Sequence, residues 1–236
     1  MSAAILEASL IELLKRVDTP TVCNAIETAQ GKRGFQAFTR QTVLAANPGL
    51  PAVVGYARTA KISAAVPSVE APQTIRERRM AYYRYMADGP KPYIAVIEDT
   101  DFPNCIGAFW GEINSTVHAG LGADGALTNG VMRDLGDLAP GFQIIAGSIG
   151  PSHAFVRVDE IDCQVNIFGL TITPGDLVHA DRHGAVIVPG DVIPSLAGAI
   201  ARMQDSERLI LEPARQSGFD IDKFVHAWEA FERARI

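Results

Sequence analysis

Helical and strand-like periodicities alternate along the first half of this chain, and that order is the feature that most constrains its fold. The N-terminal stretch predicts an amphipathic helix, because one helical stripe carries the apolar residues Ile5, Leu6, Leu10, Leu13, Leu14 and Val17. A second helix is predicted from Asp18 or Thr19, either of which could cap it, with Pro20 in its first turn. The pattern then predicts strands at 51–63 and 91–99, a helix between them at 71–89, and a helix at 112–121.

Strands cluster in the second half of the chain. Four apolar segments separated by Gly, Pro and Asp carry strand signals: "GALTNG", "FQIIAGS", "AFVRVDEIDCQVNIFGLTI" and "LVHADRHGAVIVP". The last lies within 173–189, which predicts a β-hairpin, and the chain from Asp191 onward is mostly helical, with interruptions near Pro213 and Gly218. We therefore predict an α/β or α+β fold in which residues 1–236 form a single domain with a mixed sheet.

The composition excludes some functional classes. The 236 residues carry a net charge of −6, whereas nucleic-acid-binding domains are usually basic, so we expect no nucleic-acid partner. The apolar runs are too short to span a membrane, and Glu7 and Glu12, without a basic start, argue against a signal peptide. Cys23, Cys105 and Cys163 are odd in number and form no CxxC pair, which is typical of reduced thiols in a cytoplasmic protein.

One segment departs from the acidic balance of the chain. Basic and aromatic residues are interleaved within the predicted helix at 71–89: Arg76, Arg78, Arg79 and Arg84 with Tyr82, Tyr83 and Tyr85. Such a cluster is compatible with an RNA-binding face or with a helix face that contacts solvent or another subunit. The second interpretation is favoured, because the rest of the chain is acidic.

The start of the helix at 112–121 has the pattern of an anion site. Gly111 could let the backbone enter the helix in a conformation that is closed to other residues. The first N–H groups of the helix, at Glu112, Ile113 and Asn114, would have no partner within it. Unpaired N–H groups at a helix start attract anions.

The same stretch continues to a pair of opposite charges. The chain is predicted to turn at Gly122 and Gly125, to run through a short strand to Gly130, and then to reach Arg133 and Asp134. A helix, turn and strand in this order return the end of the strand to the start of the helix. There Arg133 could hold a carboxylate with two hydrogen bonds, and Asp134 could hold Mg²⁺, which often takes few carboxylates and keeps several waters.

Spacing by itself leaves a plain alternative open, in which the glycines are turn residues and Arg133 and Asp134 are a solvated pair.

Other kinds of catalytic or binding site fit the sequence less well. "GLGADG" follows a helix and precedes a strand, which is the wrong order for a dinucleotide-binding turn. No P-loop or G-x-S-x-G motif occurs, and no lysine lies in the stretch. His179 and His183 are four residues apart but in a strand and turn, so they do not predict a metal site.

These motifs together resemble a known family. The spacing "GxxxxGxxTNGxxRD", followed by "AGSIGPS" and "PGDxxxADxxGxxxVP", resembles the RraA-like family across residues 18–190. That family includes pyruvate aldolases that cleave 4-hydroxy-4-methyl-2-oxoglutarate or 4-carboxy-4-hydroxy-2-oxoadipate, and regulators of ribonuclease E; some members carry an old label as demethylmenaquinone methyltransferases. The resemblance implies a swivelling β/β/α-type domain with layered mixed sheets flanked by helices, followed here by a helical extension at 191–236. It also implies a homotrimer or a dimer of trimers, with the site at the subunit boundary.

The resemblance also implies roles for the candidate residues. In the aldolases the backbone at a helix start and the motif arginine bind the pyruvate portion, and these positions are Gly111, Glu112, Ile113, Asn114 and Arg133 here. The next aspartate holds the divalent cation, so Asp134 is the expected ligand for Mg²⁺ or Mn²⁺. Glu112 would orient metal-bound water, and a further acidic residue would come from a neighbouring subunit.

The expected function is a metal-dependent aldolase that releases pyruvate from a 4-hydroxy-2-oxo acid, with oxaloacetate decarboxylation as a side activity. Regulators in this family can lack the aspartate that follows the arginine, so Asp134 favours an enzyme. A non-catalytic protein-binding regulator of a ribonuclease, and a lyase that acts on a different 2-oxo acid, remain alternatives. Segment 66–92 and His153 depart from the family pattern, and we expect them to shape the pocket beyond the pyruvate portion.

Overall fold

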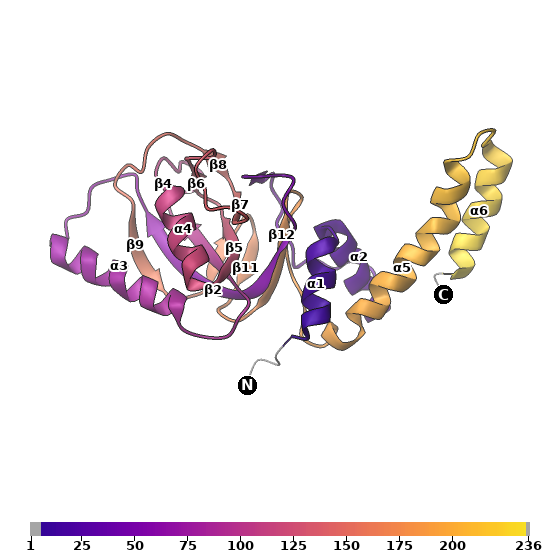
Figure 1. The fold of residues 1–236 in the computed structure, drawn as a ribbon, viewed down its shortest axis with the longest axis horizontal. Helices are drawn as coiled ribbons and strands as arrows, with labels where there is room; N and C mark the ends of the chain where they lie inside the picture. The colour runs from indigo at the N-terminus through magenta and orange to yellow at the C-terminus, as the bar shows by residue number, and fades with distance from the viewer. Residues whose placement is uncertain (1–5, 235–236) are drawn as a thin grey trace. The chain divides into compact units, whose positions relative to one another are not determined.

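The computed structural model describes residues 6–234, so Ile5 of the predicted N-terminal stripe lies outside the described residues (Figure 1). The chain divides into two compact units. The first comprises the chain up to Pro20 together with Gln36–Val188, and the second comprises Thr21–Phe35 together with the chain from Pro189. The sequence prediction treated the C-terminal helices as an extension of a single domain, whereas here they belong to a unit that also takes in residues 21–35.

Helices make up the second unit. It contains most of α2 (Thr19–Gln30) and a pair of helices, α5 (Ile193–Ala214) and α6 (Ile221–Ala234), that pack on each other. The predicted interruption between this pair is confirmed: Pro213 lies in the last turn of α5, and Gly218 in the link has a φ of +74°. A residue with a side chain rarely adopts that conformation, which explains the glycine.

The first unit is built on a large mixed sheet. Its strands follow the order β1-β7-β5-β3-β2-β12-β13, and β9 also pairs with β2. The parallel centre consists of β2 (Val53–Ser63), β3 (Tyr93–Asp99), β5 (Ala123–Thr128) and β7 (Gln143–Ala146). The antiparallel strands are β1 (Leu44–Ala45), β9 (Arg157–Ile161), β12 (Leu177–Asp181) and β13 (Gly184–Ile187). This is the mixed α/β architecture that the sequence predicts.

Both faces of the central sheet are buried. Successive residues of β3 alternate between two hydrophobic cores: Ile94 and Val96 belong to one, and Tyr93, Ala95 and Ile97 belong to the other. Parallel strands covered on both faces carry continuous apolar runs, which is why 91–99 reads as an unbroken apolar segment. The first core is closed by the hairpin of β10 (Val165–Ile167) and β11 (Leu170–Ile172).

Helices and a second sheet cover the other core. α3 (Pro72–Ala87) contributes Tyr82 and Met86 to it, and α4 (Glu112–Leu121) follows β4 (Ala108–Trp110). β4 lies in a small parallel sheet with β6 (Val131–Met132) and β8 (Ser148–Ile149), in the order β4-β6-β8. α1 (Ala8–Arg16) is the predicted amphipathic helix, with Leu10 and Leu14 buried.

The element predictions agree with the structure to within a few residues. The helix at 112–121 has the predicted bounds, and the helix at 71–89 spans Pro72–Ala87. The predicted hairpin within 173–189 consists of β12 and β13. One detail is wrong: Gly125 does not turn the chain but lies inside β5, where a Cβ would meet Val53 Cγ1 and the backbone of Gln143.

Two negative predictions can be compared with residues 6–234. Within this range, no helix is both long enough and apolar enough to cross a membrane. Among the described residues, Cys23, Cys105 and Cys163 are not joined by a disulfide.

We predict that Gly55→Ala destabilises the first unit. A Cβ at this buried position in β2 would lie 2.8 Å from Tyr93 Cα and 2.9 Å from the Pro92 carbonyl oxygen. Both atoms belong to the backbone, so the two strands must separate, at a cost of about 1–3 kcal/mol. The control is Gly120→Ala at an exposed position of α4, where a Cβ meets no atom within 4 Å and helix propensity gains about 0.5–1 kcal/mol. Denaturant unfolding measures both, and equal stability of the two variants would contradict the prediction.

Candidate functional site

The site lies where parallel strands end side by side. β4 pairs with β6 in parallel register, with Trp110 opposite Met132, and the Arg133 N–H donates to the Trp110 carbonyl at 2.8 Å. The chain leaves β4 through Gly111 into α4, and it leaves β6 through Arg133 and Asp134. Because carboxyl ends of parallel strands meet at one edge, this pairing brings the start of α4 and the Arg133–Asp134 pair together.

A hydrogen bond joins the two halves of the site. The Glu112 N–H donates to Asp134 Oδ2 at 3.3 Å, so the carboxylate of Asp134 binds the first N–H of α4. A negative charge at the N-terminus of a helix also interacts favourably with the helix dipole. The sequence predicted the proximity of these residues but not this bond.

Gly111 is needed for space rather than for an unusual backbone. Its φ of −163° and ψ of −164° are extended values that other residues adopt, so the predicted conformational role is wrong. A Cβ at this position would lie 2.5 Å from Asp134 Oδ2 and 3.1 Å from Arg133 Cγ. The absence of a side chain therefore allows Asp134 to reach the helix start.

Asp134 has a strained backbone conformation. Its φ is +54°, in the left-handed region that few residues with a side chain occupy. Such strain costs on the order of 1–3 kcal/mol and is found most often at functional sites. The ion pair between Arg133 Nε and Asp134 Oδ2, at 3.4 Å, does not offset this cost, because both side chains are about one third exposed and such pairs contribute about 0–1 kcal/mol.

Two N–H groups at the start of α4 remain available. The Ser115 N–H donates to the Gly111 carbonyl, but no described residue accepts from the N–H of Ile113 or Asn114. The Asn114 side chain is already engaged: Nδ2 donates to the Phe109 carbonyl at 2.5 Å, and Oδ1 accepts from Tyr83 at 2.6 Å. Asn114 therefore offers its main chain, not its amide side chain, to an anion.

Buried groups fix the position of α4 from behind. His118 is fully buried; its Nδ1 lies 2.6 Å from the Asn114 carbonyl and its Nε2 lies 2.6 Å from the Tyr82 hydroxyl. A carbonyl only accepts, so Nδ1 carries the proton and Nε2 accepts from Tyr82. Burial lowers the pKa of His118 to about 4, while the hydrogen bond to Asn114 opposes this shift. The ring is therefore neutral at pH 7 and serves as a support for the helix start.

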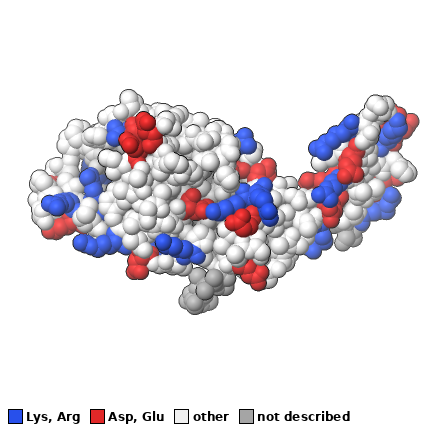
Figure 2. Space-filling view, in the orientation of Figure 1, with Lys and Arg blue, Asp and Glu red and all other residues white. Residues whose placement is uncertain are grey.

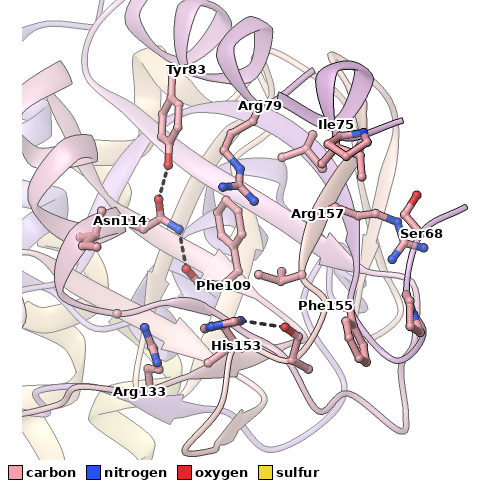
Figure 3. A pocket seen from close by; sticks show the side chains of 18 of the residues that line it. Ser68, Ile75, Arg79, Tyr83, Phe109, Asn114, Arg133, His153, Phe155 and Arg157 are labelled. Carbon is pink, nitrogen blue, oxygen red and sulfur yellow. Dashed lines mark hydrogen bonds between the residues drawn. The ribbon is translucent and has the colours of Figure 1, made fainter. Parts of the chain in front are cut away.

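Segments far apart in the sequence line one pocket of about 590 Å³ (Figure 3). Its lining includes all six residues that the sequence singled out: Gly111, Glu112, Ile113, Asn114, Arg133 and Asp134. α3, the segment before β9 and the start of β9 supply further lining, including Arg79, Tyr83, His153, Phe155 and Arg157. His153 and part of segment 66–92 thus lie where the sequence analysis expected them to shape a pocket.

Asn129 and Gly130 of the "TNG" motif form hydrogen bonds that hold the strand ends beside this pocket in place. Asn129 Oδ1 accepts from the Asp99 N–H at 2.7 Å, and Asn129 Nδ2 donates to the Asp99 carbonyl at 3.1 Å. The carbonyl of Gly130 accepts from the N–H groups of Gly147 and Ser148. These bonds hold the chain just before Arg133 against the neighbouring strands.

Sequence reasoning expected segment 66–92 to shape the pocket but did not identify which residues of α3 line it. It interpreted the basic and aromatic cluster as a surface, but Tyr82 is buried and the Tyr83 hydroxyl binds Asn114. Arg76 and Arg84 are exposed. Figure 2 shows both signs of charge interspersed on the face in view, rather than one basic patch. The signal in the sequence was the spacing of Ile75, Arg79 and Tyr83, which places them on one helix face.

Few side chains in the described part of the chain are arranged as metal ligands. Over residues 6–234, no group of three or more His, Cys, Asp or Glu side chains is arranged to hold a metal ion. His179 lies in β12 and is fully buried between Thr19 and carbonyls of the chain at Leu14 and Val17, and His183 pairs with Asp181. The carboxylates that line the pocket are Glu70, Glu112 and Asp134, and Glu70 pairs with Arg78, so Asp134 and Glu112 are the candidate ligands.

Known proteins resemble both the sequence and the fold. The family model for RraA-like proteins, described as Aldolase/RraA, matches residues 19–187. The uncharacterized protein MJ0644 of Methanocaldococcus jannaschii is 28% identical over 107 residues, which cover 44% of this chain and 51% of that protein. The match therefore spans only half of the length of that relative.

Two crystal structures have a similar fold. An uncharacterized protein from Pseudomonas syringae pv. tomato aligns with a TM-score of 0.67 at 20% identity, covering 100% of this chain and 96% of that one. RraAS2 of Streptomyces coelicolor, described as an unusual member of the RNase ES inhibitor RraA protein family, aligns with a TM-score of 0.64 at 22% identity, covering 90% and 99%. At such low identity these likenesses concern the fold alone.

We predict that His118 makes stability depend on pH. Its folded pKa of about 4 lies below the ordinary value of 6.5, so between these values the unfolded chain binds more protons than the folded one. The free energy of unfolding should therefore fall as the pH drops from about 6.5 to about 4, by up to about 1.4 kcal/mol per pH unit from this residue. Urea unfolding of wild type and His118→Gln across this range measures the effect as the difference between them. A difference that does not change with pH would contradict the prediction.

Proposed function

Because the chain belongs to the RraA-like (Aldolase/RraA) family, we propose that it is a divalent-metal-dependent pyruvate aldolase, a lyase that cleaves a 4-hydroxy-2-oxo acid. The observation that carries the proposal is the convergence, at one end of the pocket, of the free N–H groups of Ile113 and Asn114 with Arg133 and Asp134. Positive groups there suit the carboxylate of a 2-oxo acid, and a carboxylate beside them suits a cation.

The residues present fit a hard divalent cation such as Mg²⁺ or Mn²⁺. Asp134 Oδ2 is engaged by the Glu112 N–H and Arg133, while no described residue donates to Asp134 Oδ1. One free carboxylate oxygen suits Mg²⁺, which binds through one or two carboxylates and keeps several waters. A further acidic ligand from a neighbouring subunit, in a trimer or a dimer of trimers, is part of the same proposal.

The substrate would be held by its carboxylate. The Arg133 guanidinium and the N–H groups of Ile113 and Asn114 would bind the carboxylate through charge-assisted hydrogen bonds, and the N-terminus of α4 adds positive potential. When bound at Asp134, the cation would supply Lewis-acid stabilisation of the charge that develops on the 2-oxo oxygen. The protein groups would be aligned before the reaction, which is the condition for electrostatic stabilisation of a transition state.

Cleavage requires one proton to leave and one to arrive. Removal of the proton from the 4-hydroxyl lets that oxygen form a carbonyl as the C3–C4 bond breaks, and the bonding electrons pass into the enolate of pyruvate. Protonation at C3 then gives pyruvate. Glu112, exposed in the first turn of α4, is the group that we propose moves these protons, directly or through a water. Oxaloacetate decarboxylation passes through the same enolate and is the expected side activity.

A protein-binding regulator is the second candidate. The Streptomyces neighbour is described as a member of an RNase ES inhibitor family, and the exposed Arg76 and Arg84 of α3 would be the contact with a ribonuclease. A lyase that acts on a different 2-oxo acid is a third. Inhibition of a ribonuclease without metal-dependent pyruvate release would favour the regulator.

The proposed activity is tested by pyruvate release. With Mg²⁺ present, 4-hydroxy-4-methyl-2-oxoglutarate and oxaloacetate should both yield pyruvate, and excess chelator should abolish the release. Asp134→Ala should lower kcat by at least about a hundredfold, as the loss of a principal electrostatic group usually does. Asp137→Ala is the matched control, because Asp137 lies in the same turn and does not line the pocket.

Two results would contradict this proposal. Release that continues in excess chelator would remove the metal from the mechanism. A near-normal rate for Asp134→Ala would support the alternative in which Asp134 and Arg133 are only a solvated ion pair.

We also predict that Gly111→Ala damages the site while the fold stays intact. The added Cβ would displace the Asp134 carboxylate, since Oδ2 lies 2.5 Å from the position of that carbon. A displacement of about 1 Å can lower a rate by on the order of a hundredfold. Gly136→Ala, where a Cβ meets no atom within 4 Å, is the control and should keep its rate. Pyruvate release measures activity and circular dichroism checks the fold; equal rates in the two variants would argue against this role of Gly111.

A further inference from the structure

His153 lines the pocket from a turn that is bound to the start of β4. The Ser152 carbonyl accepts from the Ala108 N–H at 2.8 Å, and the His153 carbonyl accepts from the Val156 N–H at 3.1 Å. Hydrogen bonds on both sides of the side chain therefore hold the main chain of this turn in place.

The residue that follows His153 has a strained backbone. Ala154 has a φ of +44°, in the left-handed region that few residues with a side chain occupy. Its N–H donates to Ser152 Oγ at 3.0 Å, and its carbonyl lies 2.7 Å from His153 Nδ1. Strained conformations are found most often at functional sites. Here the strained residue supplies the carbonyl that binds the His153 ring.

This contact fixes the position of the proton on the neutral ring. A carbonyl only accepts, so Nδ1 of His153 carries the proton and Nε2 carries a lone pair. No described residue donates a hydrogen bond to this Nε2. Because the side chain is exposed, Nε2 can accept a proton from a bound molecule and release it to water afterwards.

The other histidines that could act here are engaged elsewhere. His118 and His179 are fully buried, and both ring nitrogens of each have partners. His183 pairs with Asp181 and does not line the pocket. Among the described residues, His153 is therefore the histidine that offers a ring nitrogen to this pocket.

His153 and Glu112 reach the pocket from the two ends of β4. The turn of His153 is bound at Ala108, the first residue of this strand, whereas Glu112 follows the last residue through Gly111. Three residues of extended chain separate these points, or about 10 Å. A substrate held at Arg133 could therefore meet a different proton-transfer group at each end of the pocket.

The ring is also turned in a suitable direction. Figure 3 shows the His153 ring between Arg133 and Phe155, with its hydrogen bond to Ala154 on one edge. The edge away from this bond faces the side of the pocket where Arg133 lies. The lone pair of Nε2 is thus presented toward the group that would hold the substrate.

We propose that His153 is a catalytic residue whose Nε2 removes the proton from the 4-hydroxyl of the substrate. As the O–H bond breaks and the N–H bond forms, the oxygen becomes a carbonyl, the C3–C4 bond breaks, and its electron pair passes into the pyruvate enolate. The imidazolium, held through Nδ1 by the Ala154 carbonyl, then releases its proton to water. Protonation of C3 remains with Glu112. This inference rests on the proposed function, because it assigns one of the two proton transfers of that reaction.

Two substrates of the same site test this role. Cleavage of a 4-hydroxy-2-oxo acid needs a base for the hydroxyl, whereas oxaloacetate loses CO₂ from a carboxylate and has no such proton to remove. His153→Gln should lower kcat for 4-hydroxy-4-methyl-2-oxoglutarate by at least about a hundredfold, a usual contribution of a general base. The same variant should decarboxylate oxaloacetate at the wild-type rate. Pyruvate release by the full chain with Mg²⁺ measures both reactions.

Further variants and a second measurement separate chemistry from structure. His153→Asn keeps an N–H donor near the position of Nδ1 but has no basic nitrogen, so it should show the same selective loss. His183→Gln, at an exposed position outside the pocket lining, should keep both rates. Exchange of the C3 protons of pyruvate with heavy water, followed by NMR, reports the enolate step alone and should be unchanged in His153→Gln.

The outcomes distinguish this role from the proposed function. If His153→Gln cleaves the hydroxy acid at the wild-type rate, or loses both reactions to the same extent, the role of His153 is overturned while wild-type pyruvate release keeps the proposed function in place. If the wild type neither cleaves the hydroxy acid nor decarboxylates oxaloacetate, the proposed function and the role of His153 both fail.

Discussion

The hydrogen bond from the Glu112 N–H to Asp134 Oδ2 is the interaction on which the candidate site depends. It joins the start of α4 to the end of β6, and it exists because Gly111 has no side chain between them. The strained φ of Asp134 places its carboxylate at this point. One contact thus relates three features that look independent in the sequence: a glycine before a helix, an acidic residue after an arginine, and the parallel pairing of two short strands.

Support for this contact comes from buried groups behind it. Tyr82 and His118 fix the main chain at Asn114, while Tyr83 fixes its side chain. Asn129 holds the strand ends through the backbone of Asp99. None of these four side chains needs to touch a substrate. They keep the N–H groups of Ile113 and Asn114 and the Arg133–Asp134 pair in one arrangement, which is what electrostatic stabilisation requires.

Local sequence patterns predicted the positions of the helices and strands well, but they predicted less well why particular glycines are needed. The bounds of α4 follow from apolar spacing and from Gly122, which ends the helix in the left-handed conformation. The interpretation of Gly111 and Gly125 was wrong because a glycine in a sequence signals conformational freedom and close approach alike. Only neighbours from distant segments distinguish the two, and here Asp134, Val53 and Gln143 are those neighbours.

The sequence by itself determined the order of helices and strands and the resemblance of the motifs to a known family. It also determined the candidate residues at the start of the helix and in the Arg133–Asp134 pair. These follow from short-range spacing, which a linear chain displays directly. The tertiary structure decided which face of α3 lines the pocket, that Tyr83 belongs to the site, and that Arg79 lies in the pocket lining. Those facts depend on which face of a helix packs against the sheet, and the weakly amphipathic α3 carries little pattern to reveal it.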